Sequence, residues 1–302
     1  MCWQDAAVIA PAIDPVVTAA ELAALVAQSD PAHPLVLADV RWYLDGRDGR
    51  AEFERAHLPG AVWVDLDRQL AAHDRSATEG RHPFPTSAEF AVAMSELGIG
   101  DGSVVIAYDD TGGLTAGRLV VMLRMLGRAA AVLDGGLAAW TRDGGDIETG
   151  PGRTPAAAEF SEQPWPADRF ADADTTAQHA ATGGAVLDAR VHERFTGEQA
   201  LIDPRPGHVP GARNAPWSAV LDTDGRLKNL DELRAHYAAL GADGDESAIA
   251  YCGSGVSACL NIVAMEHLGL TPPRLYVASW SGWSAAPDRP AELGDPWGES
   301  HA

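Results

Sequence analysis

The chain is 302 residues long, which is enough for two domains of ordinary size, and its hydrophobic fraction of 46% excludes a disordered protein. Its 22 lysines and arginines are outnumbered by 43 acidic residues, which gives a net charge of −21. Nucleic acids and anionic membranes bind basic surfaces, so this balance argues against both kinds of partner, and any anionic substrate needs a local basic pocket.

The first half of the chain alternates short apolar runs with helical patterns. Thr86 and Glu89 form a capping-box signature where one of these helical patterns begins. Such alternation is typical of the α/β class, with a mainly parallel sheet flanked by helices on both faces. The predicted elements of this half are strands at residues 35–40, 62–65, 104–108 and 130–133 and helices near residues 50–56, 87–97 and 115–126.

A segment rich in glycine, proline, alanine and acidic residues follows at residues 146–174 and has neither a strand nor a helix period. We predict that it is a linker, wrapped over one domain, between a domain at residues 1–145 and a second at residues 175–302. The second half repeats the alternation, with strands near residues 185–188, 247–251 and 274–277 and helices near residues 229–239 and 257–268.

The order of motifs in the first half returns in the second half. The offset between the copies is about 145 residues, which is too long for a solenoid and therefore indicates a duplicated domain. The matched pairs are LVLADVR (35–41) with AVLDAR (185–190), HLPGA (57–61) with HVPGA (208–212), VVIAYD (104–109) with SAIAYC (247–252), and LDGGLAAW (133–140) with YVASWSGW (276–283).

The cysteines and the amino-terminal residues indicate the compartment. Cys2, Cys252 and Cys259 are too few, and odd in number, for a disulfide framework. No group of cysteines and histidines has the spacing of a zinc site, so we expect neither a metal nor another cofactor. Residues 1–12 lack the basic region of a signal peptide, and no apolar stretch of about 20 residues could span a membrane. We therefore expect a soluble, cytoplasmic protein.

Cys252 stands where an apolar strand ends and a glycine-rich loop leads into a helix pattern. A sulfur in this position is surrounded by loop N–H groups and faces the positive end of the helix, and both favour the reactive thiolate. The carboxyl ends of parallel strands are also where active sites lie. The alternative is a buried structural cysteine, but the glycines at positions 253 and 255 favour a reactive one.

Two chemistries share a cysteine between a strand and a helix. Cysteine phosphatases use the pattern Cys-x5-Arg, in which the arginine binds the phosphate, but here that position holds Ala258. Sulfur transfer is the other chemistry. On the paired strand motifs, the two HxPGA segments, the DGGxxxW run and the CGSGVSA loop, the chain resembles the tandem-domain sulfurtransferases, the rhodanese and 3-mercaptopyruvate sulfurtransferase family, over about residues 15–285.

The resemblance implies two rhodanese-like domains, of which the carboxy-terminal one is catalytic. Asp109 occupies the place of the cysteine in the first half, and a carboxylate cannot accept sulfur, so that copy is expected to be non-catalytic. The implied reaction moves sulfur from 3-mercaptopyruvate through a persulfide on Cys252 to a thiol acceptor such as thioredoxin or a small thiol, or to cyanide, and releases pyruvate.

The resemblance also implies a set of site residues. Arg194 and Arg205 match the arginines that bind the substrate, and a relay of Asp67, His82 and Ser254 would handle the proton. Asp65 remains an alternative to Asp67, and His73 to His82. The loop residues expected to line the substrate are Gly253, Gly255, Val256 and Ser257, of which Ser257 is also expected to cap the following helix.

The loop further bears on the sulfur donor. Thiosulfate-type members of the family resemble Cys-Arg-Lys-Gly, whereas Gly253 and Ser254 stand at the cationic positions here, as in the mercaptopyruvate type. A neutral loop attracts a doubly charged anion less strongly. Two alternatives stay open: a thiosulfate:cyanide sulfurtransferase, and a carrier module that holds a persulfide for a partner.

Structural roles are expected for the remaining motif residues. Asp39 should pair with Arg41, and Asp188 with Arg190, at the ends of their strands. His57 and His208 precede Pro-Gly turns and should fix the backbone. Cys259 should be buried on the helix, with a resolving thiol as the alternative, and Trp280 and Trp283 should wall the mouth of the site.

Overall fold

The computed structural model describes residues 12–28, 30–200, 202–244 and 248–298, and these form two compact units. The first unit comprises the described residues up to Gln69 together with Pro85–Trp165. The second comprises Leu70–Phe84 and the described residues from Pro166 onward. Residues 70–84 thus belong to the second unit, whereas the predicted boundaries placed them in the amino-terminal domain.

The first unit is built on a five-stranded parallel sheet with the order β1-β5-β4-β2-β3. All residues of β4 and β5, two of its three interior strands, are buried, so both faces of the sheet are covered there. Its strands are β1 (Val16–Val17), β2 (Leu35–Asp39), β3 (Val62–Trp63), β4 (Val104–Tyr108) and β5 (Ala129–Leu133).

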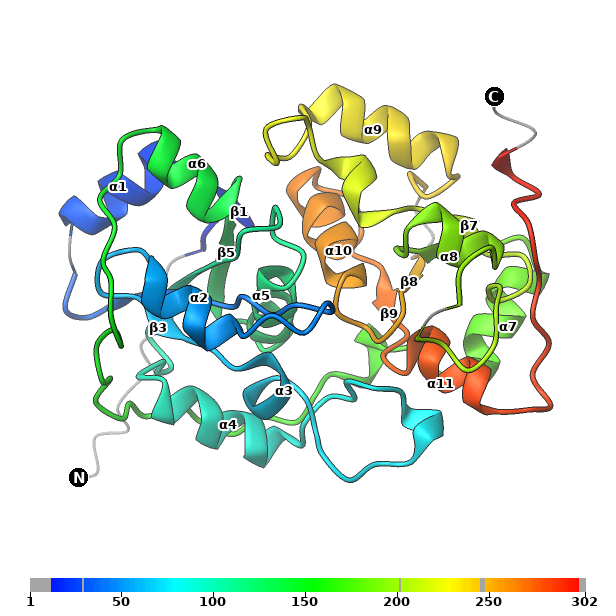
Figure 1. Cartoon of the computed structure of the whole chain (residues 1–302), viewed down its shortest axis with the longest axis horizontal. Helices are drawn as coiled ribbons and strands as arrows, with labels where there is room; N and C mark the ends of the chain where they lie inside the picture. The colour runs from blue at the N-terminus through cyan, green and yellow to red at the C-terminus, as the bar shows by residue number, and fades with distance from the viewer. Residues whose placement is uncertain (1–11, 29, 201, 245–247, 299–302) are drawn as a thin grey trace, which may run out of the picture. The chain divides into compact units, whose positions relative to one another are not determined.

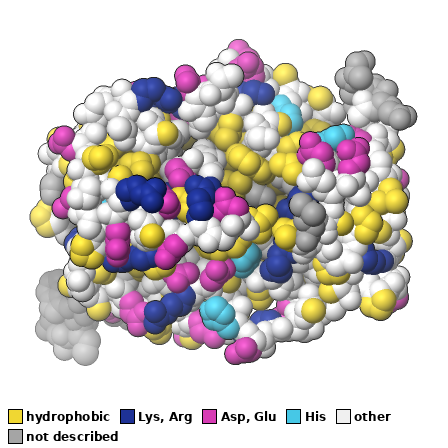
Figure 2. Space-filling model, in the orientation of Figure 1, with side chains coloured by type: hydrophobic (Ala, Val, Ile, Leu, Met, Phe, Trp, Pro, Cys, Tyr) yellow, Lys and Arg dark blue, Asp and Glu magenta, His cyan; other side chains and the backbone are white. Residues whose placement is uncertain are grey.

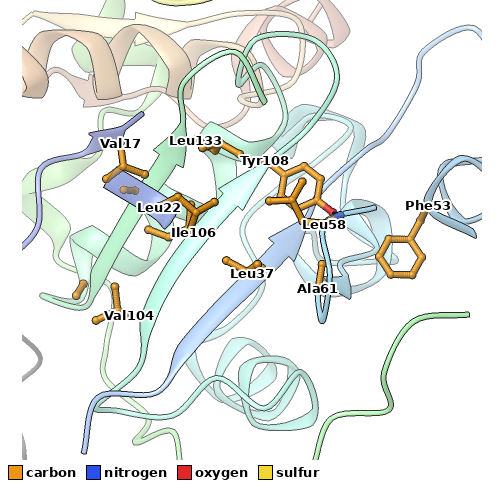
Figure 3. Close-up of a cluster of buried hydrophobic side chains, with 12 residues drawn as sticks. Val17, Leu22, Leu37, Phe53, Leu58, Ala61, Val104, Ile106, Tyr108 and Leu133 are labelled. Atoms are coloured by element: carbon orange, nitrogen blue, oxygen red, sulfur yellow. Dashed lines mark hydrogen bonds between the residues drawn. The ribbon is translucent and has the colours of Figure 1, made fainter. Parts of the chain in front are cut away.

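Helices surround this sheet (Figure 1). Thr86 and Glu89 make both bonds of the predicted capping box at the start of α4. Side chains from the strands, from α1 and from the segment after α2 meet in one apolar cluster, in which the Tyr108 hydroxyl lies beside Leu58 (Figure 3). The helices of this unit are α1 (Ala19–Gln28), α2 (Gly49–Arg55), α3 (Leu66–Gln69), α4 (Ser87–Glu96), α5 (Ala116–Met125) and α6 (Gly136–Arg142).

The second unit repeats the plan on a four-stranded parallel sheet with the order β7-β6-β8-β9. Its strands are β6 (Val186–Asp188), β7 (Arg213–Asn214), β8 (Ile249–Tyr251) and β9 (Arg274–Leu275). Its helices are η1 (Ala77–Glu79), η2 (Ala167–Arg169), α7 (Ala173–Ala181), α8 (His192–Thr196), η3 (Trp217–Val220), α9 (Leu230–Ala239), α10 (Ala258–His267) and α11 (Ser279–Ala285).

The predicted α/β class and parallel sheets are confirmed in both units, and the predicted strands and helices coincide with structural elements to within a few residues. The sequence patterns missed short elements, among them β1, β7, α8 and α11, because two to seven residues carry too little periodicity. They also missed two longer helices, α1 with 10 residues and α7 with 9. Helix α7 begins at Ala173, inside the predicted linker. The predicted strand at 247–251 is observed from Ile249, and Ser247, like Cys2, lies outside the described residues.

The duplication is visible in matched contacts around two buried histidines. The His57 ring stacks on Phe53 at 3.9 Å, and its Nδ1 atom lies 2.8 Å from the Phe53 carbonyl oxygen. The His208 ring stacks on Phe195 at 3.7 Å, with Nδ1 at 2.9 Å from the Phe195 carbonyl oxygen. Burial lowers the pKa of His208. These contacts confirm that both histidines fix the backbone.

The predicted ion pairs at the strand ends are confirmed as a second matched pair of contacts. Arg41 reaches both carboxylate oxygens of Asp39, with Nη2 at 2.6 Å from Oδ2. Arg190 holds Asp188 in the same way, with the same shortest distance of 2.6 Å. All four side chains are almost completely buried, so each pair must be geometrically well satisfied to offset its desolvation.

Charged side chains of both signs are exposed on the face drawn in Figure 2. On the face drawn in Figure 2, basic side chains are interspersed with acidic ones rather than collected into one area. Among the described residues, none of the helices combines the length and the apolar character that crossing a membrane requires.

Candidate active site

Cys252 follows directly on β8, at the carboxyl end of the second sheet, and is only 2% exposed. The Gly255 N–H group donates to its sulfur at 3.1 Å. Gly255 adopts a φ of +76°, a conformation that favours glycine and that turns this N–H group toward the sulfur. The predicted placement of the cysteine between a strand and a glycine-rich loop is therefore what the structure shows.

The start of α11 fixes the backbone at Cys252. The Cys252 N–H group donates to the Ser279 hydroxyl at 3.1 Å, and the Trp280 N–H group donates to the Cys252 carbonyl oxygen at 2.9 Å. Ser279 has a φ of +53°, which is strained for a residue with a Cβ atom. This strain at a residue that holds the cysteine is typical of a functional site.

The corresponding loop of the first unit shows what such a loop binds. One carboxylate oxygen of Asp109 accepts from the N–H groups of Thr111 and Gly113, both at 2.8 Å. The other accepts from the N–H groups of Thr115 and Ala116 at 2.8 and 3.0 Å and from the Thr115 hydroxyl at 3.0 Å. The side chain is fully buried. A loop at the end of this strand is thus a nest of N–H groups that receives an anion.

His82 contacts Ser254, which belongs to the cysteine loop. The Ser254 hydroxyl lies 2.8 Å from His82 Nδ1, and the two residues are 8% and 7% exposed. The third predicted member of the relay, Asp67, lies on α3 in the first unit, where it accepts a hydrogen bond from Trp42 Nε1 at 2.8 Å. Its part in the relay remains a prediction. The alternative histidine, His73, is exposed.

Two glycines allow residues 70–84, which carry His82, to pack closely against α11. A Cβ atom at Gly80 would lie 2.4 Å from a backbone oxygen at the start of α11, and one at Gly282 would lie 2.5 Å from a backbone oxygen of η1. The Arg81 N–H group donates to the Ser281 hydroxyl at 3.1 Å. This segment, which includes η1, is the cyan loop in Figure 1. It brings His82 to Ser254 and Arg81 to Gly253 in the cysteine loop.

Two guanidinium groups lie against Gly253. A Cβ atom at this glycine would stand 2.9 Å from Nη2 of Arg194 and 3.0 Å from Nη2 of Arg81. The loop itself is neutral, as predicted, but its surroundings carry positive charge. Arg194 was predicted from the sequence, whereas Arg81 was not, and its position next to His82 was the only sequence signal for it.

The carboxylate of Asp203 bridges these two arginines. Its Oδ1 atom accepts from Arg81 Nη1 at 3.0 Å, its Oδ2 atom accepts from Arg194 Nη2 at 2.5 Å, and Arg190 Nη1 lies 3.5 Å from Oδ2. Burial alone would raise the pKa of this carboxyl, but the guanidinium of Arg194 and its neighbours outweigh that effect and lower the pKa. No sequence pattern indicated Asp203.

Arg205 has another role than the predicted one. Its guanidinium donates to four backbone carbonyls at and just beyond the end of α11, those of Trp283, Ser284, Ala286 and Arg289, at 2.9–3.4 Å. These hydrogen bonds occupy the donors that a substrate carboxylate would need. The prediction that Arg205 binds substrate is therefore corrected: the residue holds the carboxyl end of α11.

Three smaller predictions can also be checked. Ser257 starts α10 with a helical backbone (φ −67°, ψ −21°), and within the described residues its side chain makes no capping bond, so the predicted cap is wrong. Trp280 and Trp283 are buried at 0% and 1% exposure in the apolar core and do not wall the mouth. Cys259 is buried as predicted, and its S–H group lies 3.3 Å from the Gly255 carbonyl oxygen.

Three comparisons with known proteins agree on the kind of protein that this chain is similar to. The family model of the rhodanese-like domain matches residues 18–143 and 172–286. A probable 3-mercaptopyruvate sulfurtransferase of Pseudomonas aeruginosa is 41% identical over 289 residues, covering 92% of this chain and 98% of that protein. The putative thiosulfate sulfurtransferase SseB of Mycobacterium tuberculosis is 39% identical over 283 residues, covering 92% and 96%. The crystal structure of SseA, a 3-mercaptopyruvate sulfotransferase from Escherichia coli, superposes with a TM-score of 0.77 at 32% identity, covering 89% of this chain and 99% of that one.

Proposed function

Because this chain belongs to the rhodanese family, we propose that it transfers sulfur from 3-mercaptopyruvate, through a persulfide on Cys252, to a thiol acceptor. One observation carries the proposal. The Cys252 sulfur accepts a hydrogen bond from the Gly255 N–H group. It does so in the loop position where the first unit holds the buried carboxylate of Asp109. A loop of this kind stabilises a thiolate before the reaction and a persulfide anion after it.

The first half-reaction makes one bond and breaks one. The Cys252 thiolate attacks the sulfur of 3-mercaptopyruvate, an S–S bond forms, and the C–S bond breaks with its electron pair going to carbon. Pyruvate leaves as its enolate. The proton of the donor thiol ends on the methyl group of pyruvate, so the cysteine is left as a persulfide anion and no outside oxidant or reductant is needed.

In the proposed mechanism, Ser254 and His82 would handle that proton. Their 2.8 Å contact lets the imidazole orient the hydroxyl, and the hydroxyl can then donate to the substrate carbonyl as the enolate forms. In the proposed relay, Asp67 would orient His82. The outer edge of the Arg194 guanidinium, which faces Gly253, would bind the substrate carboxylate.

In the second half-reaction a thiolate takes the outer sulfur and Cys252 returns to its thiolate form. A small thiol or reduced thioredoxin would serve in a reducing compartment such as the cytoplasm, and cyanide would serve in an assay. Pyruvate leaves before the acceptor reacts, and the enzyme alternates between its thiolate and persulfide forms, so ping-pong kinetics are expected. Asp109 cannot accept sulfur, so we propose that the first unit is a non-catalytic copy.

Thiosulfate is the second candidate donor. The guanidiniums of Arg81 and Arg194 beside Gly253 can attract a dianion, and one relative is named for thiosulfate. The test is the ratio of kcat/KM for the two donors with a common thiol acceptor. A larger value for 3-mercaptopyruvate supports the proposal, and a larger value for thiosulfate overturns it. Persulfide formation without turnover to any small thiol would instead indicate a carrier module.

Ser254→Ala should separate the two donors. We expect kcat with 3-mercaptopyruvate to fall about a hundredfold, because the enolate loses its proton donor. Thiosulfate releases sulfite and needs no such proton, so its kcat should change much less. Steady-state kinetics with both donors measure the difference. Equal losses with both would show that Ser254 only shapes the loop.

Arg194→Gln and Arg205→Gln form a matched pair. The first should raise KM for 3-mercaptopyruvate roughly tenfold to a hundredfold, since a charge-assisted hydrogen bond to the carboxylate is lost. The second should leave KM nearly unchanged but lower the free energy of unfolding by about 1–3 kcal/mol, because it leaves carbonyls at the end of α11 unpaired. Initial rates and denaturant unfolding distinguish them, and the reverse pattern would restore Arg205 to the substrate site.

A further inference from the structure

The charges next to the cysteine loop form one connected cluster. Asp203 has a side chain that is only 1% exposed, and its two oxygens contact the guanidiniums of Arg81, Arg194 and Arg190. Arg190 in turn holds Asp188. Three guanidiniums and two carboxylates leave a single positive charge. Of these groups, Arg81 and Arg194 are the ones whose Nη2 atoms face Gly253.

We propose, on the basis of the proposed function, that Asp203 is a specificity-determining residue that matches the site to singly charged sulfur donors and disfavours doubly charged ones. It does so by cancelling one of the two positive charges that face the cysteine loop. A 3-mercaptopyruvate anion carries one negative charge in its carboxylate and balances the cluster. Thiosulfate carries two, and its second charge finds no partner among these groups.

Asp203 also fixes the direction of the two guanidiniums. Each oxygen of its carboxylate accepts from a different arginine, so both Nη2 atoms are held toward the same side. Arg81 is fastened further by a bond from Nη1 to the Ile202 carbonyl oxygen at 3.2 Å. The absence of a side chain at Gly253 leaves the space that these atoms occupy. Charge and geometry at the loop therefore both depend on Asp203.

Asp203→Asn tests the proposal. The amide keeps the size of the side chain and one acceptor oxygen but leaves the cluster with two positive charges. We expect the ratio of kcat/KM for 3-mercaptopyruvate over thiosulfate to fall about tenfold, mainly through a lower KM for thiosulfate, and to recover partly at high salt. Arg81→Gln removes one positive charge instead and should raise the same ratio. Asp231→Asn, at a carboxylate whose side chain is 99% exposed on α9, changes the net charge equally and should leave the ratio unchanged.

A binding measurement separates this proposal from the proposed function. Calorimetric titration of wild type and Asp203→Asn with sulfate and with pyruvate should show that the variant binds sulfate several-fold more tightly, with a smaller change for pyruvate. If wild type failed to use 3-mercaptopyruvate, the proposed function would fall, yet this comparison of anions would still decide the role of Asp203. Equal weakening of both anions in Asp203→Asn, or a ratio that shifts in the same direction in Arg81→Gln, would overturn the proposal.

Discussion

Cys252→Ser should abolish sulfur transfer from every donor, lowering kcat by at least about a thousandfold, while the fold stays intact. A serine hydroxyl is a far weaker nucleophile than a thiolate and cannot form the S–S bond on which both half-reactions depend. The hydroxyl fits the buried position and can still accept the N–H group of Gly255, so the loop should persist. Assays with both donors, together with circular dichroism, measure the two effects.

Mass spectrometry adds a direct readout of the intermediate. Wild type exposed to the donor without an acceptor should gain one sulfur atom on the peptide that contains Cys252. Cys259→Ser is the matched control, because its hydroxyl can replace the S–H group at the Gly255 carbonyl and it should still form the persulfide. Turnover by Cys252→Ser, or the added sulfur on another residue, would refute the mechanism.

Local and repeated features were predictable from the sequence. The ion pairs of Asp39 with Arg41 and of Asp188 with Arg190 join residues two positions apart, and each motif occurs twice, so one copy supports the interpretation of the other. The position of Cys252 also follows from local sequence alone, since a strand, a glycine-rich loop and a helix are contiguous.

Features that depend on contacts between distant segments were not predictable. Arg81 and Asp203 are more than a hundred residues apart, and they meet only because Gly80 and Gly282 let residues 70–84 lie against α11. The guanidinium N–H groups of Arg205 likewise donate to backbone carbonyls about 80 residues further along the chain. A motif can therefore identify an arginine in the substrate-binding region without showing whether its donors are free.

Asp109→Ala should lower the free energy of unfolding of the first unit by about 3–5 kcal/mol, although Asp109 takes no part in the proposed chemistry. The carboxylate accepts five hydrogen bonds in a fully buried position, and its removal leaves the N–H groups of the loop without an acceptor. Hydrogen exchange of the main-chain N–H groups in β4 and α5 reports this unit separately, which matters because two units need not unfold in one step.

The neighbouring residue provides the control for this variant. Asp110 is exposed and accepts one hydrogen bond from the Tyr43 hydroxyl at 2.6 Å, so Asp110→Ala should cost only about 1 kcal/mol. Equal effects of the two substitutions would show that the loop of the first unit is not built around an anion. A large loss confined to Asp109→Ala would instead show that the loop of the first unit is built around the carboxylate it holds, in the loop position where the second unit holds the Cys252 sulfur.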